Sequence, residues 1–325
     1  IRFWQQARSL IEAPTFYDDF ETAKMFWWFN QSSTARYSCT PKPHYGCDGS
    51  KVFDVLDHTD CDLVRHHGPF PFFSFWGPGA GLPCSQWIAD ATATVMRQKR
   101  PQVTLAYLPH LDYDYQRFPD HDPARVGEVD QCVARIIAAA DDIGAQVVVV
   151  SEYGLVPVRR PVHINRVLRE MGLLSVRRGP FGEILMPGES KAFAVSDHQL
   201  AHVYVNDASV TSAVRSELES VDGIGGLFDP SELELGHCRS GELVALAEPD
   251  SWFTYYYWIE DHKAPDFART VDIHRKPIAP PFHPDRGNIP ANIPVQPGEC
   301  GVILGMVIGR RHTGRVLQHH LVHPH

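Results

Sequence analysis

Two apolar runs decide the fold of this chain: QVTLAYL at residues 102–108 and AQVVVV at residues 145–150. Each run has the length of a β-strand, and neither shows the polar–apolar alternation of a half-exposed strand. Between them, residues 126–143 carry apolar side chains at helical spacing, and Gly144 follows. Strand, helix and strand in this order, with continuously apolar strands, indicate a parallel sheet covered on both faces. We therefore predict an α/β fold with a doubly wound, mostly parallel sheet and helices on both faces.

The sequence on either side of this unit supplies further elements. Residues 1–25 are predicted to be helical, and the aromatic run at 26–29 is predicted to be a buried strand. An amphipathic helix is expected over residues 88–98, ending before Pro101. Beyond residue 150 the patterns predict a helix at 164–171, a hairpin at 192–205, a helix at 210–221 and a strand at 242–247.

The domain limits follow from a change in composition. Residues 1–277 are interpreted as one domain, with a smaller inserted region at about 176–250. Residues 278–325 contain seven prolines and six histidines but no lysine. This composition predicts a poorly ordered tail, and a histidine-rich metal-binding tract is the alternative.

Charge and hydropathy limit the partners of the protein. The 325 residues are 43% hydrophobic and 21% charged, with a formal net charge of −9. Because no long Lys/Arg run occurs, binding to a nucleic acid polymer is not expected. The best apolar candidate for a membrane helix, residues 302–308, is far shorter than the ~20 residues that a span requires.

The cysteines point to a reducing compartment. The seven cysteines are scattered, none forms a C-x-x-C pair, and their odd number argues against a disulfide framework. A cytoplasmic location is therefore favoured. No signal peptide is visible, but Ile1 is not a natural start, so this prediction does not extend to the natural amino terminus.

Two acidic residues come directly after the two predicted strands. Asp112 follows residues 102–108, and Glu152 follows residues 145–150. In parallel sheets, functional groups gather beyond the carboxyl ends of the strands. If the two strands are neighbours, the carboxylates converge and predict a divalent metal site. The alternative is that each carboxylate caps a following helix or turn.

Three histidines are further candidate ligands. His274 lies in a short stretch with Arg275, whose positive charge could screen a phosphate group. His198 and His202 lie four residues apart around the predicted hairpin. A lone histidine is more often structural than ligating, so each of these candidates has a structural alternative.

Four ordered motifs carry a resemblance to a known family. They are YLPHLDYDYQR at 107–117, VSEYG at 150–154, DHQLAH at 197–202 and APDFARTVDIHRKP at 264–277. Together they resemble the nucleotide pyrophosphatase/type I phosphodiesterase branch of the alkaline phosphatase superfamily. The resemblance covers residues 1–277 and implies an alkaline-phosphatase-like fold.

The resemblance implies a metal-dependent phosphoester hydrolase. In the superfamily two divalent metals, commonly zinc, flank a Thr or Ser nucleophile. The family's ligand pair of Asp and His falls on Asp112 and Gln116, and its Ser-Asp-His-Gly motif falls on residues 151–154. Its last ligand histidine falls on His274. Zinc is therefore the expected metal, and Mn²⁺ or Mg²⁺ are alternatives.

The chain departs from the family pattern at several positions. Gln116 and Tyr153 replace two imidazole ligands, so a single metal or recruitment of His110, His198 or His202 are possible remedies. In the family, a metal-binding Asp and the nucleophile precede the segment that matches residues 1–6. No Ser or Thr of this chain has the expected strand-to-helix context; those considered were Thr15, Ser32, Ser33 and Thr34. The nucleophile segment is therefore expected to be missing.

The expected function is hydrolysis of phosphodiester, pyrophosphate or phosphomonoester bonds in a small phosphorylated or nucleotide-like substrate. Because the nucleophile segment is expected to be missing, the alternative is a non-catalytic module that binds a phosphate ligand. A sulfate or phosphonate ester is a third possibility. Gln116, Tyr153, Tyr113 and Arg275 are the predicted substrate-binding residues. Aromatic side chains that could stack on a base or cover an apolar leaving group are Trp27, Trp28, Trp76 and Tyr113.

Overall fold

A computed structural model describes residues 7–48, 51–75, 79–112, 122–151, 154, 156–270 and 304–310. The chain forms two compact units. The first unit contains residues 1–111, 122–152 and 303–325, and the second contains residues 112–121 and 153–302. Each unit has its own sheet, and each is described separately below.

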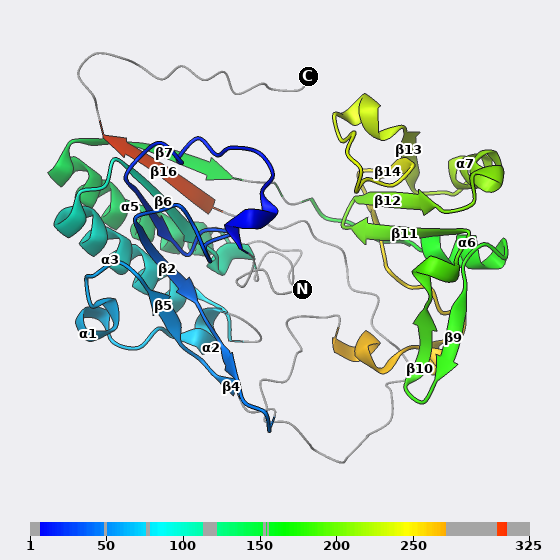
Figure 1. Ribbon diagram of the computed structural model, residues 1–325, viewed down its shortest axis with the longest axis horizontal. Helices are drawn as coiled ribbons and strands as arrows, with labels where there is room; N and C mark the ends of the chain where they lie inside the picture. The colour runs from blue at the N-terminus through cyan, green and yellow to red at the C-terminus, as the bar shows by residue number, and fades with distance from the viewer. Residues whose placement is uncertain are drawn as a thin grey trace. The chain divides into compact units, whose positions relative to one another are not determined.

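The first unit is built on a mostly parallel six-stranded sheet with the order β5-β2-β1-β6-β16-β7 (Figure 1). β1 pairs in parallel with both β2 and β6. β6 and β7 run in the same direction because both are antiparallel to β16. The predicted mixed α/β class with a mainly parallel sheet is confirmed. The strands are β1 (Thr22–Met25), β2 (Tyr37–Pro41), β5 (Val55–Asp57), β6 (Val103–Leu108), β7 (Ala145–Ser151) and β16 (Leu304–Arg310).

The two strands that were predicted from the sequence are present but are not neighbours. β16 lies between β6 and β7 and pairs with both of them. The ends of β6 and β7 are therefore about 10 Å apart, two strand spacings rather than one. β16 also places a regular element within the Pro- and His-rich segment, at residues 304–310.

Burial of β7 differs from the sequence prediction. Val148, Val149 and Val150 are 45%, 48% and 41% exposed. β7 is the last strand of the sheet formed by the described residues, so it lacks a neighbour on one side there. The sequence pattern correctly identified a strand but not its position at the edge.

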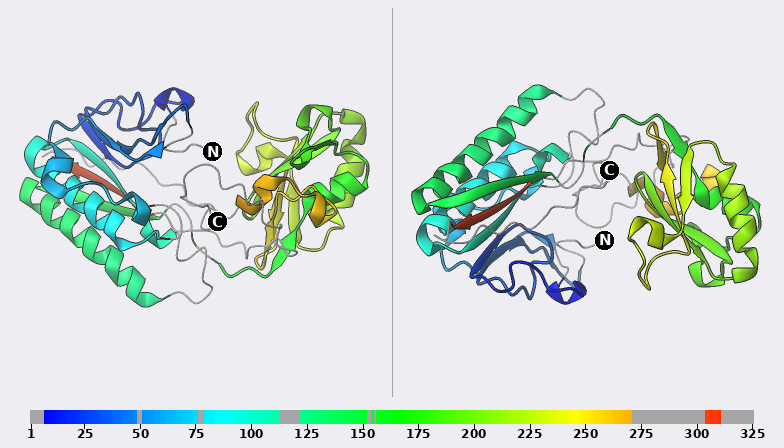
Figure 2. Two further views of the ribbon diagram at one scale, coloured as in Figure 1. Left: turned by 90° about the horizontal axis from the view of Figure 1, so that it is seen from below. Right: turned by 90° about the horizontal axis from the view of Figure 1, so that it is seen from above.

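Two long helices cover one face of the sheet. α3 (Leu82–Lys99) packs against β1, β6 and α5 (Pro123–Ile143), and Figure 2 shows the two helices side by side. α3 ends at Arg100, whose φ is +52°, before Pro101. α5 begins with Asp122, whose side chain accepts a hydrogen bond from the Ala124 amide, and ends at Gly144 with φ +67°. The carboxyl ends predicted for both helices are confirmed to within one residue, whereas α3 begins at Leu82 instead of residue 88 and α5 at Pro123 instead of residue 126.

The opposite face is covered by the N-terminal segment, drawn in dark blue in Figure 2. The prediction of a helix over residues 1–25 is wrong for the described part. Residues 8–10 form a 3-10 turn and residues 22–25 form β1. Asp18 explains the local fold, because its carboxylate accepts hydrogen bonds from Arg8, the Thr15 amide and Thr34, and these bonds lower its pKa. Such bonds favour a turn over a helix. Tyr17 then packs on Val103 and Leu105.

Smaller elements complete the first unit. Phe26–Phe29, predicted as a strand, instead forms a turn after β1, since Phe26 and Phe29 have φ values of +57° and +51°. The remaining elements are β3 (His44–Tyr45), β4 (Lys51–Val52), α1 (Leu63–His67) and α2 (Phe72–Phe75).

The second unit contains a four-stranded antiparallel sheet with the order β11-β12-β14-β13. Its helices pack against β11 and β13. The strands are β11 (Ala192–Asp197), β12 (Leu200–Val205), β13 (Ile224–Phe228) and β14 (Leu243–Ala247), and the helices are α6 (Ile164–Glu170) and α7 (Thr211–Glu219). Two small sheets add β8 (Arg160–Val162) with β15 (Ser251–Phe253) and β9 (Val176–Gly179) with β10 (Gly182–Leu185). Short 3-10 turns lie at 187–189, 208–210, 230–233, 261–263 and 266–270.

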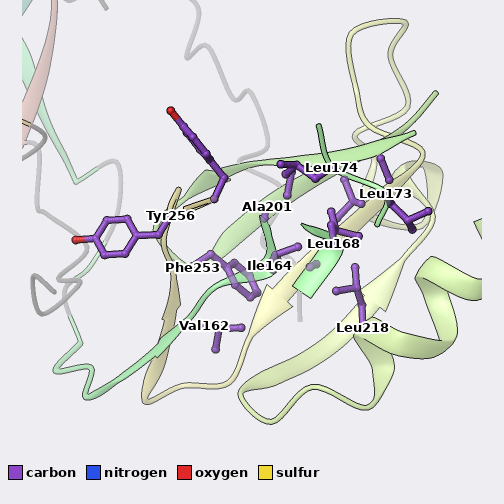
Figure 3. Packing of buried hydrophobic residues seen from close by; sticks show 14 of the residues in the cluster. Val162, Ile164, Leu168, Leu173, Leu174, Ala201, Leu218, Phe253 and Tyr256 are labelled. Carbon is purple, nitrogen blue, oxygen red and sulfur yellow. The ribbon is translucent and has the colours of Figure 1, made fainter. Parts of the chain in front are cut away.

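An apolar cluster of described residues lies between the sheet and the helices of the second unit. Ile164 and Leu168 of α6 and Val203 of β12 are fully buried in it. Figure 3 shows the packing around Ile164 and Leu168. The hairpin, helices and strand predicted for this part of the chain are confirmed within a few residues. The proposed domain limits, 1–277 with an insertion near 176–250, stay a prediction. In the described part of the chain, no helix is long and apolar enough to cross a membrane.

Candidate functional site

The predicted site begins where β1 and β6 end, at the carboxyl ends of these two neighbouring strands. We call this side of the sheet its carboxyl edge. The two strands are in parallel register, with Lys24 beside Leu105 and Met25 beside Ala106. The chain leaves β6 at Leu108, and Asp112 follows as a partly buried residue. The structure thus places Asp112 just beyond a strand end, as expected for a functional carboxylate in a parallel sheet.

The turn after β1 brings aromatic side chains to the same edge. We call residues 26–30 the aromatic turn. Phe26 points into a cluster with Phe70, Phe75 and Trp87, at ring-centroid distances of 4.6, 5.8 and 5.8 Å. Trp28 instead contacts Tyr107, the penultimate residue of β6, at 5.8 Å. Phe26 is therefore a core residue, whereas Trp28 lies at the edge that leads to Asp112.

His110, one of the imidazoles considered as a replacement ligand, lies against α3 and α5. Its side chain is fully buried, and its Nδ1 lies 2.8 Å from the hydroxyl of Ser85 in α3. Its Nε2 lies 3.9 Å from a carboxylate oxygen of Glu128 in α5 and has no hydrogen-bond partner. Burial lowers the pKa of His110 to about 4, against the opposite effect of Glu128. The imidazole therefore faces the two helices and links them to the end of β6.

His198 and His202 lie on the β11–β12 hairpin of the second unit. His198 occupies the turn with φ +53°, and its side chain is 46% exposed, 3.7 Å from a carboxylate oxygen of Asp197. His202 is paired with Val195, on the face of the sheet opposite to the core residue Val203. Its Nδ1 accepts a weak hydrogen bond from the Gly241 amide at 3.3 Å. The hairpin therefore separates the two imidazoles into a turn position and a strand position.

The other predicted site residues lie outside the described residues. They are Glu152 and His274 among the metal ligands, and Tyr113, Gln116, Tyr153 and Arg275 among the substrate-binding residues, together with Trp76. Within the part of the chain that the structure describes, no group of three His, Cys, Asp or Glu side chains could hold a metal ion. The described residues therefore supply Asp112 but not a complete ligand set.

The sequence analysis missed one polar residue near the ends of these strands, Lys24. Lys24 lies in the middle of β1 and is fully buried, with its Nζ bonded to the aromatic turn. Its signal was available, because a lysine between two apolar residues of a short strand is unusual. The assignment of residues 1–25 to a helix hid that signal.

A family model of type I phosphodiesterases/nucleotide pyrophosphatases matches residues 2–277. The chain belongs to this family. The resemblance stated from the four motifs is thereby confirmed. No curated protein sequence matches the chain.

The fold is similar to that of one hydrolase solved with two ligands. The phosphonoacetate hydrolase of Sinorhizobium meliloti 1021, in complex with phosphonoacetate, is similar with a TM-score of 0.55 and 13% identity. The match covers 95% of this chain and 71% of the hydrolase. The same hydrolase in complex with phosphonoformate gives a TM-score of 0.52 at 13% identity, over the same shares of both chains. An inactive form of murine ectonucleotide pyrophosphatase/phosphodiesterase 5 with AMP gives 0.33 at 12% identity, over 60% of this chain and 44% of that one.

The segment matched by the family model contains both the strands of the sheet and the sequence motifs that follow them. The family match includes the segments that form β1, β6 and β7 and the sequence that follows β6 and β7. The hydrolase of Sinorhizobium meliloti, at 13% identity, supports the α/β architecture alone.

Proposed function

We propose that this chain acts on phosphodiester, pyrophosphate or phosphomonoester bonds of a small phosphorylated substrate, at the carboxyl edge of β1 and β6. The observation that carries the proposal is the position of Asp112 within a chain matched to the phosphodiesterase family over residues 2–277. A partly buried carboxylate in the segment that follows a parallel strand can hold a cation close to a phosphate group.

A divalent metal is part of the proposal, with Asp112, Glu152 and His274 as its ligands and His198 and His202 as further candidates. When bound, the metal would polarise the phosphoryl oxygens and stabilise negative charge. Zinc is favoured by the family, and manganese and magnesium suit oxygen ligands. Since the described residues contain no complete ligand set, we derive no reaction step through the metal.

The residues of the chain would then have separate tasks. Asp112 would bind the cation, and the aromatic turn would contact the organic part of the substrate through Trp28. His110 would support the end of β6 by bonding to Ser85 of α3, rather than by binding metal. Gln116, Tyr113, Tyr153 and Arg275 remain the proposed contacts to the phosphate and its substituent.

The second candidate function is a binding module that keeps the phosphate-binding surface without turnover. The replacement of two family imidazoles by Gln116 and Tyr153 favours it, since fewer ligands weaken a two-metal site. Both functions place the phosphate at the same edge of the sheet, so turnover distinguishes them.

The test combines elemental analysis with an activity assay. The purified chain is analysed for Zn, Mn and Mg, and then assayed with bis(p-nitrophenyl) phosphate after addition of each metal. The variants are Asp112→Ala with Glu152→Ala, and Asp142→Asn as a control, because Asp142 forms an exposed ion pair with Arg97 at 2.7 Å. We expect metal in the wild type and in Asp142→Asn and its loss in the double variant. Turnover that follows the same pattern would support hydrolysis, and metal binding without turnover would agree with the missing nucleophile segment.

Two other results have clear meanings. Saturable binding of phosphate without turnover would favour the binding module. A wild-type chain that is folded but binds neither metal nor phosphate would refute both candidate functions.

A further inference from the structure

A cavity of about 340 Å³ lies between three helices of the first unit, α1, α3 and α5. We call it the interhelical cavity. Its volume is at the lower end of the range found for small-molecule sites. None of its residues has a part in the proposed function. The residues that line it are His67 of α1, Asp90, Ala93, Thr94 and Arg97 of α3, and Arg135 and Ala138 of α5.

Small side chains leave this space open. The four lining residues of α3 are spaced at i, i+3, i+4 and i+7, so they share one face of the helix. Ala93 of α3 and Ala138 of α5 have no side-chain atom beyond Cβ with which to fill the cavity. His67 contributes to the wall, and its Nε2 lies 2.9 Å from the hydroxyl of Thr94. Burial lowers the pKa of His67, so this wall is uncharged at neutral pH.

Two ion pairs join α3 to α5 beside the cavity. A terminal nitrogen of Arg135 lies 3.0 Å from both carboxylate oxygens of Asp90, and Nε of Arg97 lies 2.7 Å from a carboxylate oxygen of Asp142. In each helix the two charged residues are seven positions apart, which corresponds to roughly 10 Å along the axis. The two guanidinium groups therefore come from opposite helices and from different turns, and both line the same cavity.

Both guanidinium groups keep donors that these ion pairs do not use. A guanidinium carries five N–H groups, and Arg97 pairs through Nε whereas Arg135 pairs through one terminal nitrogen. Within the described residues, the remaining nitrogens of both side chains have no hydrogen-bond partner. Since Asp90 is the one carboxylate in the lining, the two arginines give the cavity a net charge of about +1.

The alternative role of the two arginines is to hold the helices together. The side chains of Arg97 and Asp142 are 47% and 56% exposed, and those of Arg135 and Asp90 are 42% and 43% exposed. Ion pairs as exposed as these contribute little to stability. Larger apolar residues at positions 93 and 138 would join the helices more effectively by packing. Two arginines around an open floor of alanines are better explained by a ligand.

We propose that the interhelical cavity binds a phosphate group with two negative charges, held between the guanidinium groups of Arg97 and Arg135. The planar guanidinium matches the oxygens of a phosphate, and such charge-assisted hydrogen bonds are strong. The phosphate can be the free ion or a monoester. In a monoester, the organic part would lie over Ala93 and Ala138, where the cavity is larger than the phosphate group requires.

Calorimetric titration with inorganic phosphate and with phenyl phosphate tests this proposal. The chain with Asp112→Ala and Glu152→Ala is used in EDTA, so that the proposed metal site does not contribute, and the wild type in EDTA provides the same measurement should that variant fold poorly. Arg97→Gln and Arg135→Gln should each weaken binding at least about tenfold. Arg65→Gln is the matched control, because Arg65 is 82% exposed and does not line the cavity. Its affinity should stay within about twofold.

Ala138→Leu separates the cavity from its charge. This substitution keeps both arginines and places a larger side chain in the cavity, so binding should again weaken at least about tenfold. Because position 138 is exposed, the circular dichroism spectrum should be unchanged. Tighter binding of phenyl phosphate than of phosphate would identify a monoester as the ligand, and equal affinities would identify the free ion.

Two results would overturn the proposal. One is a wild-type chain that binds neither probe in EDTA. The other is binding that persists unchanged in Ala138→Leu or in either arginine variant. Neither result affects the proposed function, because none of these residues belongs to it.

Discussion

The ion pair between Arg169 of α6 and Glu183 of β10 offers a sharp test of the second unit. Glu183 is 2% exposed, and its two carboxylate oxygens lie 2.5 and 3.0 Å from the two terminal nitrogens of Arg169. Arg169 also donates to the carbonyl of Tyr257 at 3.0 Å. Glu183→Gln keeps the shape of the side chain but removes its charge.

The expected cost follows from burial. Removing one partner of a buried pair typically destabilises a protein by roughly 3–5 kcal/mol. Because Arg169 is 20% exposed and the new amide oxygen still accepts a hydrogen bond, we expect the lower end, about 3 kcal/mol. For a unit of this size each kcal/mol corresponds to roughly 2–4 °C in melting temperature, so the transition should fall by about 6–12 °C.

Thermal unfolding followed by circular dichroism measures this shift. The matched control is Glu189→Gln, because Glu189 lies 4.0 Å from Arg177 and the two side chains are 58% and 71% exposed. An exposed pair of this kind contributes less than about 1 kcal/mol. If both variants melt within about 1 °C of each other, the reasoning from burial is wrong.

Three further perturbations test local features. Gly144→Ala should destabilise the first unit by about 1–2 kcal/mol in urea unfolding, because Gly144 has φ +67°. Gly127→Ala, inside α5, should instead stabilise the unit by up to about 1 kcal/mol. Equal effects of the two substitutions would contradict the role of Gly144 as the helix cap. Leu168→Ala removes a fully buried side chain and should cost about 2–5 kcal/mol by the same measurement, so a loss below about 1 kcal/mol would mean that the core collapses around it. Burial lowers the pKa of His163 to about 4, so the unfolded chain is protonated before the folded chain as the pH falls from about 6.5. The free energy of unfolding should therefore decline between about pH 6.5 and 4, and it should decline less steeply in His163→Gln. An identical slope in both proteins would contradict this.

The parts of the fold that the sequence predicted are those with a strong local signal. The carboxyl end of α5 could be read from Gly144, because capping residues act on their immediate neighbours, whereas its start was predicted at residue 126 instead of Pro123. β6 and β7 could be read from their apolar runs. β1 has only four residues, Thr22–Met25, which is too short for a period to be distinguished from that of a helix.

Strand order could not be predicted for a different reason. The apolar run at residues 302–308 was visible in the sequence, but it lies in a segment whose composition indicates poor order. Its insertion between β6 and β7 depends on pairing across a long sequence separation, and no local pattern specifies the partner strand.

The candidate site was predicted in part. Asp112 could be placed because strand ends in parallel sheets are a general location for functional groups. The role of His110 could not be read, because the sequence does not show that its imidazole faces Ser85 and Glu128 in two different helices. Lys24 was missed because residues 1–25 were assigned to a helix, although a lysine between two apolar residues is itself visible in the sequence. Its acceptors could not be read, since they are main-chain carbonyls.

The position of β16 has a consequence for how the chain folds. β16 begins roughly 150 residues after β7 ends, so the central part of the sheet requires the closure of a very long loop. During synthesis, β6 and β7 leave the ribosome well before the strand that joins them, and their edges stay unpaired until it arrives. Contacts of such long range slow folding. We therefore expect the second unit, whose described elements are continuous in sequence from residue 160 to 270, to complete its structure first, with the sheet of the first unit closing last.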